Sequence, residues 1–282
     1  MVDPSTRFAG RSVGQEVASR RGVVQYRRTW AAENPRANVL LLHGIAEHSG
    51  RYEHVGATLA EAGYSVRSYD HHGHGRSGGK RGHVDSFEVF LDDVEDNLAE
   101  LRSKELPVVL MAHSMGGLIA FNYAVSDRPQ PDVVLLSGPA LGADVPTWQR
   151  VAAPILGRLA PKLFITSQFD GALLSTDPDV GHVYANDPLR VKGATAGLGL
   201  ALFKAMEVAN QRLARLSVPT MVVHGAQDPI VPPHFTVPIG QLRSATRTEL
   251  PGLMHEVLNE PNWPDTLQTL IDFADRTLAG SQ

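Results

Sequence analysis

Short apolar runs separated by longer mixed segments recur along this chain. Five of them are rich in Val and Leu and end beside turn or catalytic-type residues, at positions 39–42, 66–69, 108–111, 133–136 and 220–223. Continuous apolar runs of this length are typical of strands that are covered on both faces, as in a parallel sheet. The pattern therefore predicts a central sheet buried between two layers.

The segments between these runs have helical spacing. Residues 87–101 place Phe87, Phe90, Leu91, Val94 and Leu98 on one face, and residues 52–62 and 118–124 have similar patterns. Alternation of strand and helix is typical of an α/β fold with a doubly wound, mostly parallel sheet.

The alternation stops after the first four strands and returns only near Val218. The interval contains five prolines and two helical patterns, at residues 148–159 and 194–213. It looks too short and too interrupted to form a domain with its own core. We interpret residues 140–216 as a helical cap inserted into one core formed by residues 1–139 and 217–282.

Residues 108–117, VVLMAHSMGG, run from an apolar strand into a helix and place Ser114 at the junction. In a nucleophile elbow such a turn exposes a serine hydroxyl and needs small neighbours. Ala112 stands where the G-x-S-x-G pattern has its first glycine, and alanine is the next smallest residue. The alternative is a helix N-cap serine that happens to precede a glycine pair.

Two backbone amides are candidates for an oxyanion hole. The earlier strand at 39–42 ends in His43-Gly44, and hydrolases of this architecture place one oxyanion amide just after such a pair and another after the nucleophile. These would be the amides of Ile45 and Met115. His43-Gly44 alone is equally compatible with an ordinary turn.

An acid and a histidine follow later strands in the order that this fold requires. Asp228 comes in the turn after the run at 220–223, and His255 comes in the loop after the next predicted strand. Asp228 would orient His255, which would take the proton of Ser114 and deliver it to the leaving group. Each residue alone could be structural, but their order makes coincidence improbable.

Composition and charge exclude several classes of function. A chain of 282 residues with 43% hydrophobic and 20% charged residues can bury a large core. A formal charge of -4 with scattered Lys and Arg argues against a nucleic-acid partner, and the absence of Cys excludes disulfides and thiolate chemistry. No signal-peptide pattern or transmembrane run is visible, so we expect a cytoplasmic or peripherally membrane-associated protein.

Two further motifs carry a family resemblance. Residues 43–52, HGIAEHSGRY, and 70–77, DHHGHGRS, together with the elbow around Ser114, closely resemble monoacylglycerol lipases, especially actinobacterial members. The resemblance runs from about Asn38 to the C-terminal helix. It implies an α/β-hydrolase core, a mobile cap, no cofactor, and hydrolysis of monoacylglycerol to fatty acid and glycerol.

The same resemblance implies the polar end of a substrate pocket. Glu47, Arg51, His113 and Tyr184 would surround this end and help to hold the glycerol. For Glu47 and Arg51 a salt bridge that locks the loop behind the oxyanion hole is an equally good interpretation.

Three histidines, His71, His72 and His74, lie close together in a Gly-rich turn. They lack the helical i, i+4 spacing of a zinc hydrolase, and no acidic third ligand is evident. We therefore predict a hydrogen-bonded turn beside the active site and no metal.

The cap segment 151–165 is strongly apolar with a few basic interruptions. It could rest on a lipid surface and admit an acyl chain, or only cover the core and line a tunnel. The sequence leaves both possibilities open, and it leaves the oligomeric state undetermined.

The residues together predict two-step acyl transfer through an acyl-enzyme on Ser114. Alternatives with the same chemistry are a lysophospholipase, a carboxylesterase for short soluble esters, and an acyltransferase. A peptidase has no positive support, and a non-catalytic ligand-binding protein would usually have lost a triad member. Dehalogenase and epoxide hydrolase chemistry needs an aspartate at position 114.

Overall fold

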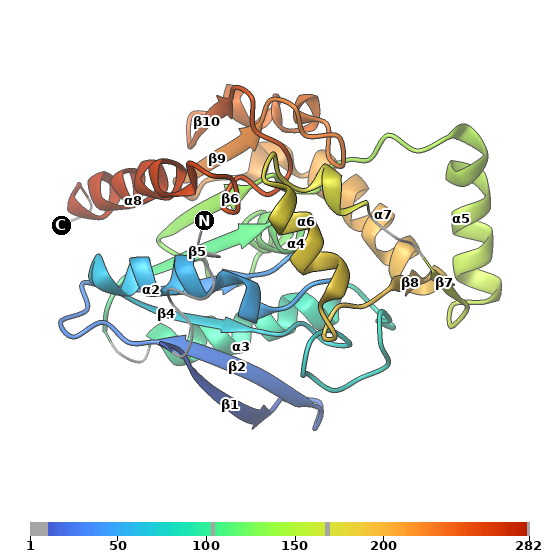
Figure 1. The fold of residues 1–282 in the computed structure, drawn as a ribbon, viewed down its shortest axis with the longest axis horizontal. Coiled ribbons are helices and arrows are strands. Elements are labelled where there is room, and N and C mark those ends of the chain that lie inside the picture. Colours follow the sequence, from blue (N-terminus) through green and yellow to red (C-terminus); the bar gives the residue numbers. More distant parts are fainter. Residues whose placement is uncertain (1–10, 103–104, 167–169, 281–282) are drawn as a thin grey trace.

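A twisted eight-stranded sheet forms the centre of the molecule. The computed structural model describes residues 11–102, 105–166 and 170–280 (Figure 1). The strands of this sheet are β1 (Val13–Ala18), β2 (Val24–Trp30), β3 (Ala37–Leu42), β4 (Tyr64–Tyr69), β5 (Val108–His113), β6 (Val133–Ser137), β9 (Thr220–Gly225) and β10 (Ala245–Leu250). Their spatial order is β1-β2-β4-β3-β5-β6-β9-β10.

Six of the strands are parallel, and the predicted fold class is confirmed. The five apolar runs of the sequence are β3, β4, β5, β6 and β9, which pair in parallel with one another and with β10. The antiparallel hairpin of β1 and β2 extends the sheet beyond β4.

Helices cover both faces of the sheet (Figure 1). They are α2 (Glu53–Glu61), α3 (Glu88–Arg102), α4 (Met115–Ala124), α5 (Thr147–Leu159), α6 (Pro178–Asn186), α7 (Ala196–Gln211) and α8 (Trp263–Ala279). Short 3₁₀ turns lie at η1 (Ser49–Tyr52), η2 (Gly171–Leu173), η3 (Leu213–Arg215), η4 (Pro233–Thr236) and η5 (Ile239–Gln241).

The central strands β3, β5, β6 and β9 are apolar at most positions because they pack on both sides. Successive side chains of a strand point to opposite faces. Leu40 and Leu110 pack with α3 and α4 in one apolar cluster, whereas Leu41 and Met111 pack with α2 and α8 in the other. This packing explains why the runs show no alternation.

The segment between β6 and β9 crosses over the carboxyl edge of the sheet. It contains α5, α6, α7 and a small hairpin of β7 (Phe164–Thr166) and β8 (Gly193–Thr195), and in Figure 1 α5 stands at the right-hand edge. Helix α7 returns the chain toward β9 and contributes Leu198, Ala205 and Ala209 to the core beside α4. The division into a core and a cap at residues 140–216 stays an interpretation.

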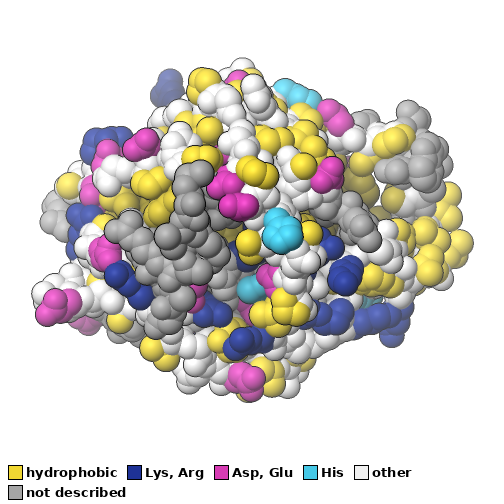
Figure 2. Space-filling model, viewed as in Figure 1, with side chains coloured by type: hydrophobic (Ala, Val, Ile, Leu, Met, Phe, Trp, Pro, Cys, Tyr) yellow, Lys and Arg dark blue, Asp and Glu magenta, His cyan; other side chains and the backbone are white. Residues whose placement is uncertain are grey.

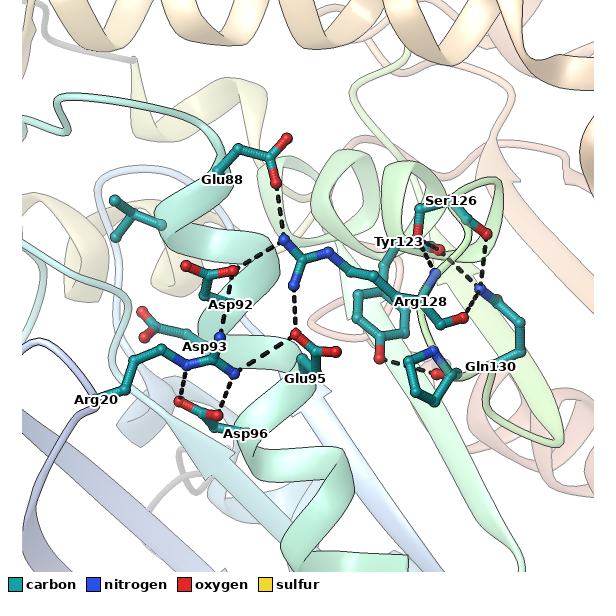
Figure 3. Close-up of polar contacts among 12 residues, drawn as sticks. Arg20, Glu88, Asp92, Asp93, Glu95, Asp96, Tyr123, Ser126, Arg128 and Gln130 are labelled. Carbon is teal, nitrogen blue, oxygen red and sulfur yellow. Dashed lines mark hydrogen bonds and ion pairs between the residues drawn. The ribbon is translucent and has the colours of Figure 1, made fainter.

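An ion-pair cluster ties the far end of α4 to α3. Arg128, which follows α4, contacts Glu88 and Asp92 at 2.8 Å and Glu95 at 2.5 Å (Figure 3). Arg20, before β2, bonds to Asp96 of the same helix. Single ion pairs that are partly exposed contribute little to stability, but several pairs here join the residue after α4 to α3.

Candidate active site

The turn from β5 into α4 holds Ser114 in a conformation that L residues rarely adopt. Its φ is 51° and its ψ is -115°. The Ser114 amide donates to Ser137 O at 3.0 Å, and its carbonyl accepts from the amides of Leu118 and Ala140, each at 3.0 Å. Strain of this kind persists only where the surroundings impose it, so neighbouring strands and helix hold the hydroxyl at the carboxyl edge of the sheet.

The glycine pair after Ser114 is required by packing. A Cβ on Gly116 would lie 2.6 Å from His43 O and 2.7 Å from Leu42 O, and one on Gly117 would lie 2.7 Å from Pro139 Cβ. These glycines therefore let α4 approach β3 and the chain after β6. Ala112, the departure from the usual pattern, is fully buried in β5.

The structure brings the three catalytic candidates together in one hydrogen-bonded row. The distance from His255 Nε2 to Ser114 Oγ is 3.0 Å, and that from His255 Nδ1 to Asp228 Oδ2 is 2.7 Å. A carboxylate only accepts, so His255 donates through Nδ1 and presents a bare Nε2 to the serine hydroxyl. All three side chains are buried.

His224 is a further member of this row that the sequence analysis did not identify. Its Nε2 lies 3.1 Å from Asp228 Oδ2 and 2.8 Å from Val231 O, so it donates to both acceptors. Asp228 Oδ1 accepts from the amides of Ile230 and Val231 at 2.9 Å. Burial raises the pKa of Asp228, but hydrogen bonds from His224 and His255 outweigh it and hold that pKa well below its usual range.

A small cavity of about 30 Å³ lies at Ser114. Its walls are Gly44, Ile45, Glu47, His113, Ser114, Leu174, Tyr184, Ile230, His255 and Glu256. The amides of Ile45 and Met115 have no acceptor among the described residues, and free donors are what an oxyanion hole requires. Ligand pockets have volumes of about 300–1,000 Å³, so the cavity is too small for an acyl chain in this structure.

Two glutamates, Glu47 and Glu256, line the polar end of the cavity, and Arg51 lies behind them. Arg51 Nη1 lies 2.6 Å from Glu47 Oε2 and 2.6 Å from Glu256 Oε1, and Arg51 Nη2 lies 2.7 Å from Glu256 Oε2. Glu47 also accepts from Tyr52 OH and from the amide of Gly44. The salt-bridge interpretation of Glu47 and Arg51 matches these contacts, and Glu47 faces the cavity as well.

Burial raises the pKa of both glutamates, but the guanidinium of Arg51 opposes this and holds the pKa of Glu256 well below its usual value. Glu256 had no role in the sequence analysis. Its position directly after His255 was the available signal.

Of the other residues expected at the polar end, His113 and Tyr184 line the cavity and Arg51 lies behind it. The Arg51 guanidinium is 5.2 Å from the centroid of the Tyr184 ring. Burial, with the nearby His255, lowers the pKa of His113 to about 3, so its ring is neutral. Tyr184 comes from α6, so the segment between β6 and β9 completes the site.

Of the three neighbouring histidines, His71 and His74 lie in one buried cluster, with ring centroids 6.4 Å apart, and His72 is only partly buried. His71 and His74 are fully buried, and His74 Nδ1 donates to His72 O at 3.0 Å. Within residues 11–102, 105–166 and 170–280, no group of three or more His, Asp or Glu side chains is arranged to hold a metal ion.

Comparisons with known proteins identify relatives of this chain. Residues 33–262 match the family described as serine aminopeptidase, S33. The chain is 38% identical over 236 residues to a monoacylglycerol lipase of Mycolicibacterium smegmatis, covering 81% of this chain and 84% of that protein. It is 31% identical over 256 residues to phospholipase YtpA of Bacillus subtilis, covering 88% and 98%.

A crystal structure of Paleococcus ferrophilus monoacylglycerol lipase superposes with a TM-score of 0.81 at 32% identity, covering 88% of this chain and 99% of that one. The match supports the α/β fold described above.

Proposed function

The chain belongs to the α/β-hydrolase family described as serine aminopeptidase, S33, and from this membership and its site geometry we propose that it is a monoacylglycerol lipase. The observation that carries the proposal is the row Ser114, His255 and Asp228 at a strained strand-to-helix turn. The similarity to the monoacylglycerol lipases of Mycolicibacterium smegmatis and Paleococcus ferrophilus supports the substrate.

The proposed reaction has two steps. Ser114 Oγ attacks the ester carbonyl carbon while His255 Nε2 takes the hydroxyl proton, and the amides of Ile45 and Met115 stabilise the oxyanion. The C–O bond to glycerol breaks as His255 returns the proton to the leaving oxygen. Water then attacks the acyl-enzyme by the same route, which releases the fatty acid and restores Ser114.

The polar end favours a neutral polyol over a phosphate headgroup. Among the described residues that line the cavity there are two glutamates and no Lys or Arg. The charge of Arg51 is already engaged by both carboxylates. Glycerol hydroxyls can donate to these carboxylates, whereas a phosphate brings only acceptors and negative charge. We therefore rank monoacylglycerol above lysophospholipid, although one relative is a phospholipase.

Substrate entry requires the segment over Ser114 to move. A cavity of about 30 Å³ holds little more than one water molecule, far less than an acyl chain. Leu174 and Tyr184 cover the site from the segment between β6 and β9. We propose that this segment is a cap that opens to admit the lipid.

The segment has an exposed apolar surface at which a cap could contact a lipid layer. Its residues are Ile155, Leu159, Leu163, Phe164 and Ile165. Figure 2 shows hydrophobic side chains gathered at the right-hand edge, where α5 and β7 lie in Figure 1, with Lys and Arg side chains beside them. Basic residues beside apolar ones are typical of interfacial segments. We propose peripheral membrane contact here.

No helix within the described residues is long and apolar enough to cross a bilayer.

A vesicle experiment tests the membrane contact. Leu159, with 81% of its surface exposed, is changed to Glu, and Val13, 68% exposed on edge strand β1, is changed to Glu as the matched control. We expect Leu159→Glu to reduce co-sedimentation with phosphatidylglycerol vesicles while Val13→Glu does not. Equal binding by both variants would contradict the proposed surface.

A substrate panel tests the function. Wild type and Ser114→Ala are compared on monoacylglycerol, diacylglycerol, triacylglycerol, lysophosphatidylcholine, p-nitrophenyl butyrate and an aminoacyl p-nitroanilide. We expect the highest kcat/KM on monoacylglycerol, equimolar glycerol and fatty acid, and no turnover by Ser114→Ala. Preference for the anilide would indicate a peptidase, and acyl products other than fatty acid would indicate an acyltransferase.

A further inference from the structure

The turn that carries Gly44 and Ile45 is held by two buried histidines that take no part in the proposed proton transfer. We propose that His43 is the positioning residue of the oxyanion hole, with its ring fixed by His71. The inference rests on the proposed function, because it assumes that the Ile45 amide binds the oxyanion.

The hydrogen-bond partners of His43 define its protonation state. Its Nδ1 lies 2.7 Å from Gly44 O, and a carbonyl only accepts, so Nδ1 carries the proton. The His71 amide donates to His43 Nε2 at 2.9 Å, so Nε2 is bare. His43 is therefore neutral and held in one tautomer.

His71 returns a second bond to the same residue. Its Nε2 lies 3.0 Å from His43 O and donates to that carbonyl. Its ring packs edge-on against Tyr69 and Phe90, with ring centroids 5.2 and 5.5 Å away. Both histidines are fully buried, and burial lowers their pKa values well below 6.5. The pair is a rigid, uncharged support.

Because the peptide group is planar, fixing the Gly44 carbonyl also fixes the Ile45 amide. In a trans peptide the C=O and the following N–H point in opposite directions. The bond from His43 Nδ1 fixes the direction of Gly44 O, and so it fixes the direction of the Ile45 N–H. The Gly44 amide is bound separately by Glu47. Rotation of the Gly44–Ile45 peptide is therefore resisted by one imidazole.

Two substitutions at position 43 separate the bond to Gly44 from the bond to His71. Asparagine places its amide at the δ position and can still donate to Gly44 O, whereas glutamine places its amide at the ε position and can only replace the link to His71. Loss of one oxyanion donor lowers turnover by about 10²- to 10³-fold. We expect His43→Gln to lower kcat by about tenfold to 10²-fold and His43→Asn by less than about threefold.

The readouts distinguish positioning from general damage. KM should be nearly unchanged in His43→Gln, while affinity for a trifluoromethyl ketone, which forms an oxyanion on Ser114, should fall with kcat. His74→Leu is the matched control: its ring is buried in the same cluster, 5.7 Å from that of His43, but makes no bond to the turn. Urea unfolding and circular dichroism establish that each variant folds.

The comparison is made on p-nitrophenyl butyrate as well as monoacylglycerol. An esterase that ignores monoacylglycerol would contradict the proposed substrate and leave this inference testable. Activity in Ser114→Ala would overturn both. If Ser114→Ala is inactive but His43→Gln retains kcat, or if His43→Asn loses as much as His43→Gln, the positioning role alone is wrong.

Discussion

Removal of the Arg51 charge should destabilise the protein strongly and with an unusual dependence on pH. Arg51, Glu47 and Glu256 have side chains that are 9%, 3% and 5% exposed, and three N–H to carboxylate contacts of 2.6 to 2.7 Å join them. Arg51→Met leaves two buried carboxylates without their cation. Breaking a buried pair in this way costs about 3–5 kcal/mol.

The expected change in melting temperature follows from chain length. At about 2.1 cal/mol/K per residue, unfolding this chain carries an entropy of about 0.6 kcal/mol/K. A loss of 3–5 kcal/mol therefore lowers Tm by about 5–8 °C. Arg215→Met is the control, because Arg215 and Asp127 form an exposed pair, 45% and 86% exposed, whose loss should change stability by less than about 0.5 kcal/mol.

The sign of the pH effect identifies the cause. Without Arg51, burial and mutual repulsion raise the folded-state pKa of both glutamates above the unfolded value of about 4.3. Acids with raised folded pKa values stabilise the fold at low pH and lose that contribution as pH rises. The deficit of Arg51→Met should therefore be largest at pH 8 and shrink toward pH 5.

Urea unfolding of wild type and both variants at pH 8, 6.5 and 5 measures this effect. Replacing both glutamates by glutamine in the Arg51→Met background should recover most of the loss. A deficit below about 1 kcal/mol, or one that is equal at pH 8 and pH 5, would refute the reasoning.

Three further predictions concern neighbouring features of the site. Asp228→Asn should lower kcat by about 10³- to 10⁴-fold with little change in KM, measured on p-nitrophenyl butyrate, because His255 would lose the partner that fixes its tautomer. Burial lowers the pKa of His74 from 6.5 to about 4, so this one side chain should lower the unfolding free energy by about 3 kcal/mol as pH drops through this range. Urea titrations should show a flatter pH dependence in His74→Leu. Gly116→Ala should lose at least about 1 kcal/mol and most of its activity, because the new Cβ would meet His43 O and Leu42 O; wild-type stability and kcat would contradict this.

Much of the core was predictable, because a strand that is buried on both faces appears in the sequence as a continuous apolar run. The strands β3, β5, β6 and β9 are apolar at nearly every position, and each ends where the site begins. Strands β1 and β2 were not predicted. Residues Gln25 and Arg27 of β2 are buried but paired with polar partners, so their burial does not appear as hydrophobicity.

The candidate site was predictable to the extent that its residues lie in motifs. Ser114, Asp228 and His255 follow strands in a fixed order, and the structure brings them within hydrogen-bond distance. His224 and Glu256 were not predicted, because their roles depend on contacts made only after folding: His224 bonds Asp228 across a turn, and Glu256 pairs with Arg51, which is 205 residues away.

The catalytic residues and the residues that cover the site come from different segments of the chain. Ser114, Asp228 and His255 each follow a strand of the sheet and His224 lies within β9, whereas Leu174 and Tyr184 belong to the crossover between β6 and β9. Within that crossover α7 belongs to the core, so the exchangeable part ends before α7. In a chimaera of two family members joined before α7, we therefore expect the covering segment to be exchanged while Ser114, Asp228 and His255 keep their places.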